Sequence, residues 1–219
     1  MSVLRNSMKV VIIDYGLSNL LSITRAFEHL GTDVVVTDDA SKIADAQRIV
    51  LPGVGAFPLG VSELKKRGFF DELKNVNEKH KTPILGICLG MQMMLTKGHE
   101  IEETEGLGFI EGEVVKLPAE QNDGKKIKVP HVAWGQLIQP PNKSWDNTIF
   151  KYNHPAQYMY FVHSYYAATK NAADVLSLTK FGDFTFTSAF QKENVYGVQF
   201  HPEKSHEDGL KILKAFVEE

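Results

Sequence analysis

The first half of the chain alternates short apolar runs with longer amphipathic stretches. Each apolar run has five or six residues, many of them β-branched, and lies between turn residues, as buried strands do. These runs cover residues 9–14, 33–37, 48–52 and 83–87. Between and after them, apolar residues recur at helical spacing, which predicts helices over 19–29, 41–46 and 61–80, with a break at Gly68, and the start of another over 91–95. Because strands that alternate with helices pair in parallel through right-handed crossovers, we expect an open, mostly parallel α/β sheet with helices on both faces.

The second half has a different pattern, with aromatic and β-branched stretches broken by turn residues. These β-like stretches are 106–119, 125–134, 158–167, 175–179, 184–190 and 195–200, and a last helix is predicted over 206–217. We therefore expect an extra antiparallel β region beside the parallel sheet. Residues 8–219 are expected to form a single domain, and residues 1–7 an N-terminal extension without stable structure.

Composition narrows the class of protein. The chain has 219 residues, 43% of them hydrophobic, and a net charge of −3, which fits an ordinary globular domain and gives no basic patch for nucleic acid. No apolar run has the length of a membrane span, and the first seven residues lack the apolar core of a signal peptide. The single cysteine excludes an internal disulfide and suits a reducing compartment. We expect a cytoplasmic protein that binds neither nucleic acid nor membrane.

That single cysteine, Cys88, stands in a Gly-x-Cys-x-Gly sequence between the fourth strand and the next helix. The same pattern with serine forms a nucleophile elbow, a sharp strand-to-helix turn that exposes the side chain. The glycines Gly86 and Gly90 remove Cβ atoms where the backbone doubles back, and they tolerate strained dihedral angles. The helix dipole would favour negative charge on the sulfur. We therefore interpret Cys88 as a nucleophile, although many lone cysteines are simply small buried residues.

A cysteine nucleophile needs a base and a group that orients the base. Of the eight histidines, His131, His163, His201 and His206 remain as candidates, because the others lie at helix ends or in polar loops. His201 is the best of them, since it follows an apolar strand and is two residues before Glu203. In extended or turned backbone this spacing places imidazole and carboxylate on one side of the chain. The predicted triad is Cys88, His201 and Glu203, and no paired histidine spacing favours a metal site.

Other parts of the site follow from the sheet topology. In parallel sheets ligands bind beyond the carboxyl ends of the strands, where the turn at Tyr15 and the loop Gly53-Val54-Gly55 also lie. The oxyanion of an acyl-transfer intermediate needs backbone N–H donors near the sulfur. The Leu89 amide, directly after the nucleophile, is one. The second should come from the glycine-flanked Val54, whose peptide can point toward the site or flip away.

The ordered motifs resemble those of the class I glutamine amidotransferases, and most closely those of the glutaminase subunit of imidazole glycerol phosphate synthase. The motifs are PGVGAF at 52–57, GICLGMQ at 86–92, GLG at 106–108, VPH at 129–131, YFVHSY at 160–165 and GVQFHPEKS at 197–205. The resemblance extends over nearly all the chain from Met8. It implies a flavodoxin-like sheet and a Cys-His-Glu glutaminase that uses no cofactor.

The resemblance also assigns substrate and partner. Cys88 would attack the side-chain amide of L-glutamine and release ammonia and glutamate. The residues that would bind glutamine are Gly53, Gly55, Gln92, Glu100, His163, Ser164 and Tyr165. Ammonia would pass to a (β/α)₈ synthase subunit, in a heterodimer that makes imidazole glycerol phosphate and an aminoimidazole ribonucleotide. The residues that match positions facing this barrel are Asn19, Trp134, Tyr160 and Lys204.

Three segments depart from the histidine-pathway pattern, at 17–19, 96–99 and 132–136. All three lie near the expected partner-facing surface or the substrate loop, so they weaken the assignment of the partner more than that of the glutaminase chemistry. A paralogous subunit that feeds ammonia to a barrel making amidino sugars for surface polysaccharide is therefore the alternative. Two other classes of protein remain as hypotheses. One is a stand-alone cysteine hydrolase, and the other is an interaction module or redox sensor that uses Cys88 alone.

Overall fold

The computed structural model describes residues 8–141 and 143–219. The N-terminal extension predicted over residues 1–7 lies outside the described residues. Among those described, no helix is both long and apolar enough to cross a membrane.

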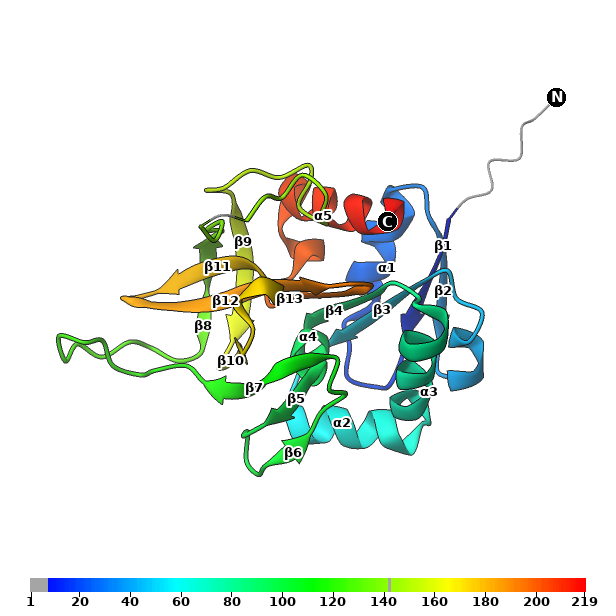
Figure 1. The fold of residues 1–219 in the computed structure, drawn as a ribbon, viewed down its shortest axis with the longest axis horizontal. Helices are drawn as coiled ribbons and strands as arrows, with labels where there is room; N and C mark the ends of the chain where they lie inside the picture. Colours follow the sequence, from blue (N-terminus) through cyan, green and yellow to red (C-terminus); the bar gives the residue numbers. More distant parts are fainter. Residues whose placement is uncertain (1–7, 142) are drawn as a thin grey trace.

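The four strands of the first half form a parallel sheet, as predicted, and a strand from the second half, expected in the antiparallel region, adds to it in parallel (Figure 1). Its strands are β1 (Lys9–Ile13), β2 (Asp33–Thr37), β3 (Arg48–Gly53), β4 (Ile84–Cys88) and β13 (Val195–Val198). They run in the order β2-β1-β3-β4-β13, and each neighbouring pair is parallel. Because β3 and β4 are in register at Gly53 and Cys88, the loop after β3 lies beside the cysteine.

The sheet continues from β13 into the predicted antiparallel region. The added strands are β5 (Leu95–Gly98), β6 (Thr104–Glu105), β7 (Ile110–Lys116), β10 (Tyr165–Thr169), β11 (Val175–Phe181) and β12 (Phe184–Lys192). Pairing is antiparallel except between β5 and β7, so the described residues form one mixed sheet of eleven strands. β8 (His131–Gln136) and β9 (Tyr158–His163) form a separate antiparallel pair, the β8–β9 ribbon.

Helices cover both faces of the sheet (Figure 1). On one face lie α1 (Leu20–His29) and α5 (His206–Glu218), and on the other α2 (Phe57–Lys66), α3 (Phe69–Asn75) and the one-turn α4 (Leu89–Met93). Successive strand residues point to opposite faces. Val10 of β1 accordingly belongs to the core under α1 and α5, and Val11 to the core under α2 and α3.

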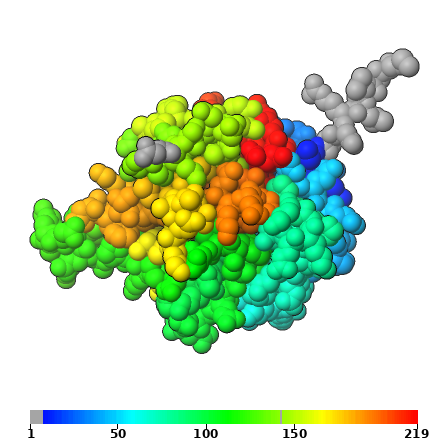
Figure 2. Space-filling view, in the orientation of Figure 1, coloured from blue at the N-terminus to red at the C-terminus, as the bar shows by residue number. Residues whose placement is uncertain are grey.

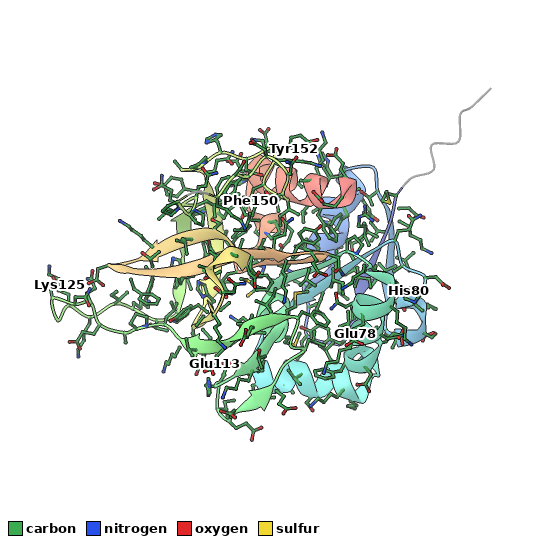
Figure 3. The ribbon with its side chains drawn as sticks, in the orientation of Figure 1. Glu78, His80, Glu113, Lys125, Phe150 and Tyr152 are labelled. Atoms are coloured by element: carbon green, nitrogen blue, oxygen red, sulfur yellow. The ribbon has the colours of Figure 1, made fainter. Side chains whose placement is uncertain are left out.

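Part of the chain projects from this body. The segment between β7 and β8 extends beside the hairpin of β11 and β12, as the space-filling view shows (Figure 2). Lys125 lies at its tip (Figure 3). The backbone N–H of Asn122 donates to the carboxylate of Asp183 in the hairpin turn, at 2.8 Å, and so joins the two.

Several predicted boundaries were wrong. The helix predicted over 41–46 is a short 3₁₀ turn, Ala40–Ile43, which the Asp39 side chain caps through the Ser41 N–H. The helix predicted over 61–80 begins earlier, at Phe57, and breaks at Gly68 as predicted; its last turn, Val76–His80, is a π-helix. The helix expected over 91–95 ends at Met93, and Leu95 begins β5.

Two β stretches were also too long. Within 106–119 the chain is extended as a strand only over Ile110–Lys116. Within 125–134 the strand begins at His131, after a cis peptide bond between Val129 and Pro130. A proline lacks the N–H that a strand ladder needs, which accounts for the late start.

Candidate active site

Cys88 is the last residue of β4 and the N-cap of α4. Its backbone has φ 54° and ψ −110°, a conformation that non-glycine residues rarely adopt. Such strain persists only where the surroundings enforce it, and it is the geometry of a nucleophile elbow. The residue is 6% exposed, so its sulfur is presented to a confined space.

The flanking glycines have a steric purpose. A Cβ on Gly90 would overlap the carbonyl oxygen of Leu51 in β3, and one on Gly86 would lie 2.7 Å from the Met91 nitrogen. Neither glycine has a positive φ. The backbone strain is therefore in Cys88, and the two glycines serve as predicted by removing Cβ atoms where backbone approaches closely.

His201 and Glu203 are in contact, as their spacing predicted. His201 follows β13, and Pro202 begins a 3₁₀ turn, Pro202–Lys204, that brings the carboxylate back toward the ring. The His201 Nδ1–H donates to Glu203 Oε1 at 2.9 Å, and the two side chains are 4% and 5% exposed. This hydrogen bond leaves Nε2 as the ring atom that can act on the sulfur.

The electrostatics of His201 favour its protonated form. Burial alone would lower its pKa, but interactions with Cys88 and Glu203 outweigh burial and raise the pKa of His201 to about 10. The Nε2 atom is buried and, among the described residues, no hydrogen bond of ordinary geometry occupies it, so it is the ring atom available to the sulfur. A protonated imidazole beside a thiolate can serve as the acid that protonates a leaving group.

The sulfur opens onto a cavity of about 210 Å³. The residues that line it are Val54, Gly55, Cys88, Leu89, Gln92, Glu100, Val162, His163, Ser164 and Tyr165. The cavity therefore collects all the residues predicted to bind substrate except Gly53, which lines a smaller void beside His201 and Glu203. Larger hollows lie elsewhere, but none of the described residues that line them is a cysteine. The size suits a small metabolite.

Two acceptor groups meet in this cavity. The Gln92 amide donates through Nε2 to the Tyr165 carbonyl at 2.8 Å and to the Gln199 side-chain oxygen at 3.0 Å. Both its hydrogens are used, so its own oxygen is the atom left for a ligand. The Glu100 carboxylate accepts from the Phe57 N–H at 2.7 Å, at the start of α2. Together they form a site for a cationic group such as an ammonium.

His163 lies behind the cavity in a neutral pair with His131. Its Nδ1–H donates to the Tyr165 carbonyl at 2.8 Å, so its Nε2 accepts from His131 Nδ1 at 3.1 Å. Burial is the main cause that lowers the pKa of His163, to about 3. This ring supports the strand that lines the cavity and does not serve as a base for the sulfur.

The two predicted oxyanion donors are in different states. Leu89 is the first residue of α4, so its N–H has no acceptor within the helix. The Val54 N–H donates to the Leu17 carbonyl at 2.8 Å and is therefore not free for a ligand. The neighbouring Gly55 has φ +116° and open space around its Cα, which leaves room for the Val54 peptide to turn.

The sequence of the chain matches the family model described as glutamine amidotransferase class-I over residues 11–219. The chain belongs to the class I glutamine amidotransferases. The imidazole glycerol phosphate synthase subunit HisH 1 of Legionella pneumophila (strain Lens) is 42% identical over 210 residues, which are 95% of this chain and 98% of that protein. The subunit HisH of Lactococcus lactis subsp. lactis (strain IL1403) is 43% identical over 213 residues, which are 96% of this chain and 98% of that protein.

Solved structures agree in fold. PurLQS from Thermotoga maritima superposes with a TM-score of 0.70 at 19% identity, over 97% of this chain and 98% of that one. A glutamine amidotransferase from the same organism gives a TM-score of 0.60 at 17% identity, over 90% of this chain and 76% of that one. The predicted family, its fold and the resemblance to the synthase subunit are confirmed.

The residues predicted to face a partner lie on one side of this amidotransferase domain. Trp134, 45% exposed, stacks on His206 with ring centroids 5.1 Å apart and contacts Tyr160 edge-on at 6.0 Å. The Lys204 ammonium lies 6.0 Å from the centre of the Tyr160 ring. Asn19 occupies the N-cap position of α1 and lines the small void next to His201 and Glu203. The surface formed by Asn19, Trp134, Tyr160 and Lys204, here called the mouth surface, thus adjoins the base side of the triad.

Sequence reasoning missed two buried residues of the site. Gln199 donates to the Cys88 sulfur at 3.7 Å, and the signal was a polar residue within the apolar stretch Val198 to Phe200. Tyr15 is fully buried, and a Cβ on Gly53 would overlap its hydroxyl, which explains the glycine there. Burial, and next the charge of Cys88, raise the pKa of Tyr15. Among the described residues, no group of three or more His, Cys, Asp or Glu side chains could hold a metal ion.

Proposed function

We propose that this chain is the glutaminase subunit of an imidazole glycerol phosphate synthase. It hydrolyses L-glutamine and passes ammonia to a (β/α)₈ partner that makes imidazole glycerol phosphate and aminoimidazole carboxamide ribonucleotide in histidine biosynthesis. The observation that carries the chemistry is the strained Cys88 elbow beside the buried His201–Glu203 pair, in a small cavity with two acceptors. Relatives named as HisH subunits, about 40% identical over nearly the whole chain, support the pathway.

The reaction proceeds in two halves. The Cys88 thiolate attacks the side-chain amide carbon of glutamine, and the carbonyl electrons move onto oxygen to form a tetrahedral oxyanion. When the oxyanion collapses, the C–N bond breaks, His201 gives its proton to the nitrogen, and ammonia leaves a glutamyl thioester. His201 then takes a proton from water, whose oxygen attacks the thioester. Glutamate leaves and the sulfur is regenerated, while Glu203 keeps the ring oriented throughout.

The cavity orients glutamine by its amino-acid end. The Gln92 oxygen and the Glu100 carboxylate accept from the α-ammonium, which matches their freedom as acceptors. The backbone of His163, Ser164 and Tyr165 lines the other side, Gly55 leaves room for the substrate beside the elbow, and Gly53 lines the adjacent void on the base side. Holding one end of the substrate fixes the distance from its amide carbon to the sulfur.

The oxyanion hole is completed only when the Val54 peptide turns. In its present hydrogen bond with Leu17, the Val54 N–H cannot stabilise the oxyanion, and Leu89 acts alone. Loss of one such donor costs about 10²–10³ in rate. We propose that binding of the barrel with its ligand breaks this bond and turns the peptide, so the isolated subunit is nearly inactive.

The mouth surface receives the partner. Its aromatic residues and Lys204 contact one another, and Asn19 lines the void on the base side of the triad, from which ammonia would depart. Passing ammonia directly to the barrel prevents its protonation in water. Residues 8–219 act as a single domain in this heterodimer, which we place in the cytoplasm.

The test is a glutaminase assay with and without a barrel subunit that co-purifies from the source lysate. We expect a low rate for the isolated chain and a rise of about 10²-fold or more when partner and phosphorylated ribonucleotide are both present. Cys88→Ala should be inactive under all conditions. A response to a sugar nucleotide and its barrel would reassign the pathway to amidino sugars. High turnover by the isolated chain would refute the switch at Val54, and turnover of peptides would indicate a stand-alone hydrolase.

A further inference from the structure

Gln199 is fully buried, yet its amide groups face the catalytic centre. Its Nε2 lies 3.7 Å from the Cys88 sulfur, and its side-chain oxygen accepts from Gln92 Nε2 at 3.0 Å. A buried amide is costly unless both its ends are bonded. Here both ends are bonded to site residues, so the side chain joins the nucleophile to the residue that holds the substrate.

The orientation of the two amides follows from the network. The Tyr165 carbonyl can only accept, so the Gln92 atom facing it at 2.8 Å must be the nitrogen. The same nitrogen faces Gln199, whose facing atom must then be oxygen. The remaining end of Gln199, directed at the sulfur, is therefore the NH₂ group. Reversing Gln92 would set its oxygen against two acceptors, and reversing Gln199 would set two donors against each other.

The network begins further back. His163 donates to the same Tyr165 carbonyl, and His131 donates to His163. A continuous series of hydrogen bonds thus leads from the β8–β9 ribbon through Tyr165 and Gln92 to Gln199 and the sulfur. Each member limits the rotation of the next.

We propose that Gln199 is a positioning residue for the proposed glutaminase reaction, with its N–H holding and stabilising the Cys88 thiolate and its C=O directing the Gln92 oxygen toward substrate. It works beside the charged and titratable groups already near the sulfur, His201 and Tyr15. An N–H donor to an anionic sulfur is a charge-assisted hydrogen bond, the stronger kind. The proposal rests on the proposed function only for its second half, since the contact with the sulfur needs no substrate.

Two substitutions separate the two contacts. Gln199→Met keeps the length of the side chain but removes both hydrogen bonds. Gln199→Glu keeps an acceptor for Gln92 and replaces the donor to Cys88 with a carboxylate. The matched control is Gln191→Met in β12, whose side-chain oxygen accepts from the Ile149 N–H at 3.4 Å away from the site. Thermal unfolding of each variant checks the fold, and the nearly isosteric Glu variant carries the test if the Met variant does not fold.

The first measurement is the rate of Cys88 alkylation by iodoacetamide against pH, without glutamine. We expect Cys88 of Gln199→Met to react about tenfold more slowly at neutral pH, because the variant lacks one hydrogen bond to a charged group. Its pH midpoint should move upward, and that of Gln199→Glu further upward. Gln191→Met should match the unmodified chain. Unchanged midpoints in both folded Gln199 variants would overturn the proposal.

The second measurement is glutamine turnover with the partner present. Gln199→Met should raise KM for glutamine several-fold as well as lower kcat, because Gln92 is released, whereas Gln199→Glu should lower kcat with a smaller change in KM. An equal change in KM in both variants would overturn the role of the C=O. If the unmodified chain hydrolyses no glutamine while alkylation shifts as expected, the proposed function fails and the contact of Gln199 with the sulfur stands.

Discussion

Two buried histidines of the site are driven in opposite directions by their surroundings. Both lose water, which disfavours the charged ring. His201 has Cys88 and Glu203 beside it, and hydrogen bonding to these two groups, together with their charge, more than offsets burial and raises its pKa. His163 has a carbonyl, a second histidine and the cationic His201 nearby, so burial prevails and the ring stays neutral. The same side chain thus acts as an acid in one place and as a fixed donor in the other.

The raised pKa of His201 predicts a loss of stability at alkaline pH. A ring that binds its proton more tightly in the folded state stabilises that state fully below the unfolded pKa of 6.5, and the benefit disappears as pH rises through about 10. Replacing the ring by His201→Asn removes this dependence. Urea unfolding at pH 6.5, 8.5 and 10 should show the free energies of unfolding of the two proteins converging by about 4 kcal/mol over this range. Parallel curves would show that the ring is not held as a cation.

The lowered pKa of His163 predicts the opposite sensitivity. Its neutral ring stabilises the fold above pH 6.5, and this contribution is lost as pH falls from 6.5 toward 3, because the unfolded chain takes up the proton first. Between pH 6.5 and 4.5 the free energy of unfolding of His163→Gln should therefore fall by roughly 2 kcal/mol less than that of the unmodified chain. Exposed His154→Gln is the control and should keep the original slope. A slope unchanged by His163→Gln would exclude a buried neutral ring.

At the scale of elements, the elbow shows what the sequence can predict. Gly-x-Cys-x-Gly after an apolar run specifies a tight turn through local sterics alone, and parallel strands place other turns at the same edge. His201 and Glu203 were found because they are two residues apart. These are short-range signals, and the family motifs strengthen each of them.

Long-range contacts explain what the sequence did not predict. α2 begins at Phe57 because the carboxylate of Glu100, 43 residues on, caps its first N–H. α4 ends after one turn because Leu95 pairs with Ile110 in β7. The orientation of Gln199 depends on its hydrogen bond with Gln92, 107 residues earlier. The Val54 N–H is likewise held by a hydrogen bond to the distant Leu17 carbonyl. None of these pairings leaves a periodic pattern that could be read in advance.

The close approach at the elbow predicts a sharp difference between two glycines. Gly90→Ala places a Cβ on the Leu51 carbonyl oxygen, so backbone must move, and we expect a loss of about 3 kcal/mol or failure to fold. Gly31→Ala is the control: its φ is +74°, but nothing lies within 4 Å of the added Cβ, so the cost should be about 1 kcal/mol. Urea midpoints measure both. Equal losses would mean that the elbow is not packed against β3 as described.

At the scale of the whole molecule, the β8–β9 ribbon connects the catalytic cavity with the mouth surface. One end of it pairs His131 with His163 under the cavity, and three residues further along it pairs Trp134 with Tyr160 at the surface. The Tyr160 carbonyl also accepts from the His201 N–H at 2.9 Å. A partner bound at the mouth surface would therefore contact β9, the strand that lines the cavity and accepts a hydrogen bond from the His201 backbone.

This arrangement predicts that Trp134 anchors the partner without shaping the thiol. A large, half-exposed aromatic ring at a contact site is the type of residue that dominates binding energy, so Trp134→Ala should weaken partner affinity by about 30-fold or more. Alkylation of Cys88 in the isolated chain should be unchanged, since the ring does not touch the sulfur. Tyr152→Ala is the matched control: Tyr152, labelled in Figure 3, is 44% exposed, donates a hydrogen bond to Glu218 of α5 and is not part of the mouth surface. Titration of the barrel subunit, followed by calorimetry, separates the two variants. If both bind the barrel as tightly as the unmodified chain, the partner occupies another face, and ammonia must leave the triad by a route other than the mouth surface.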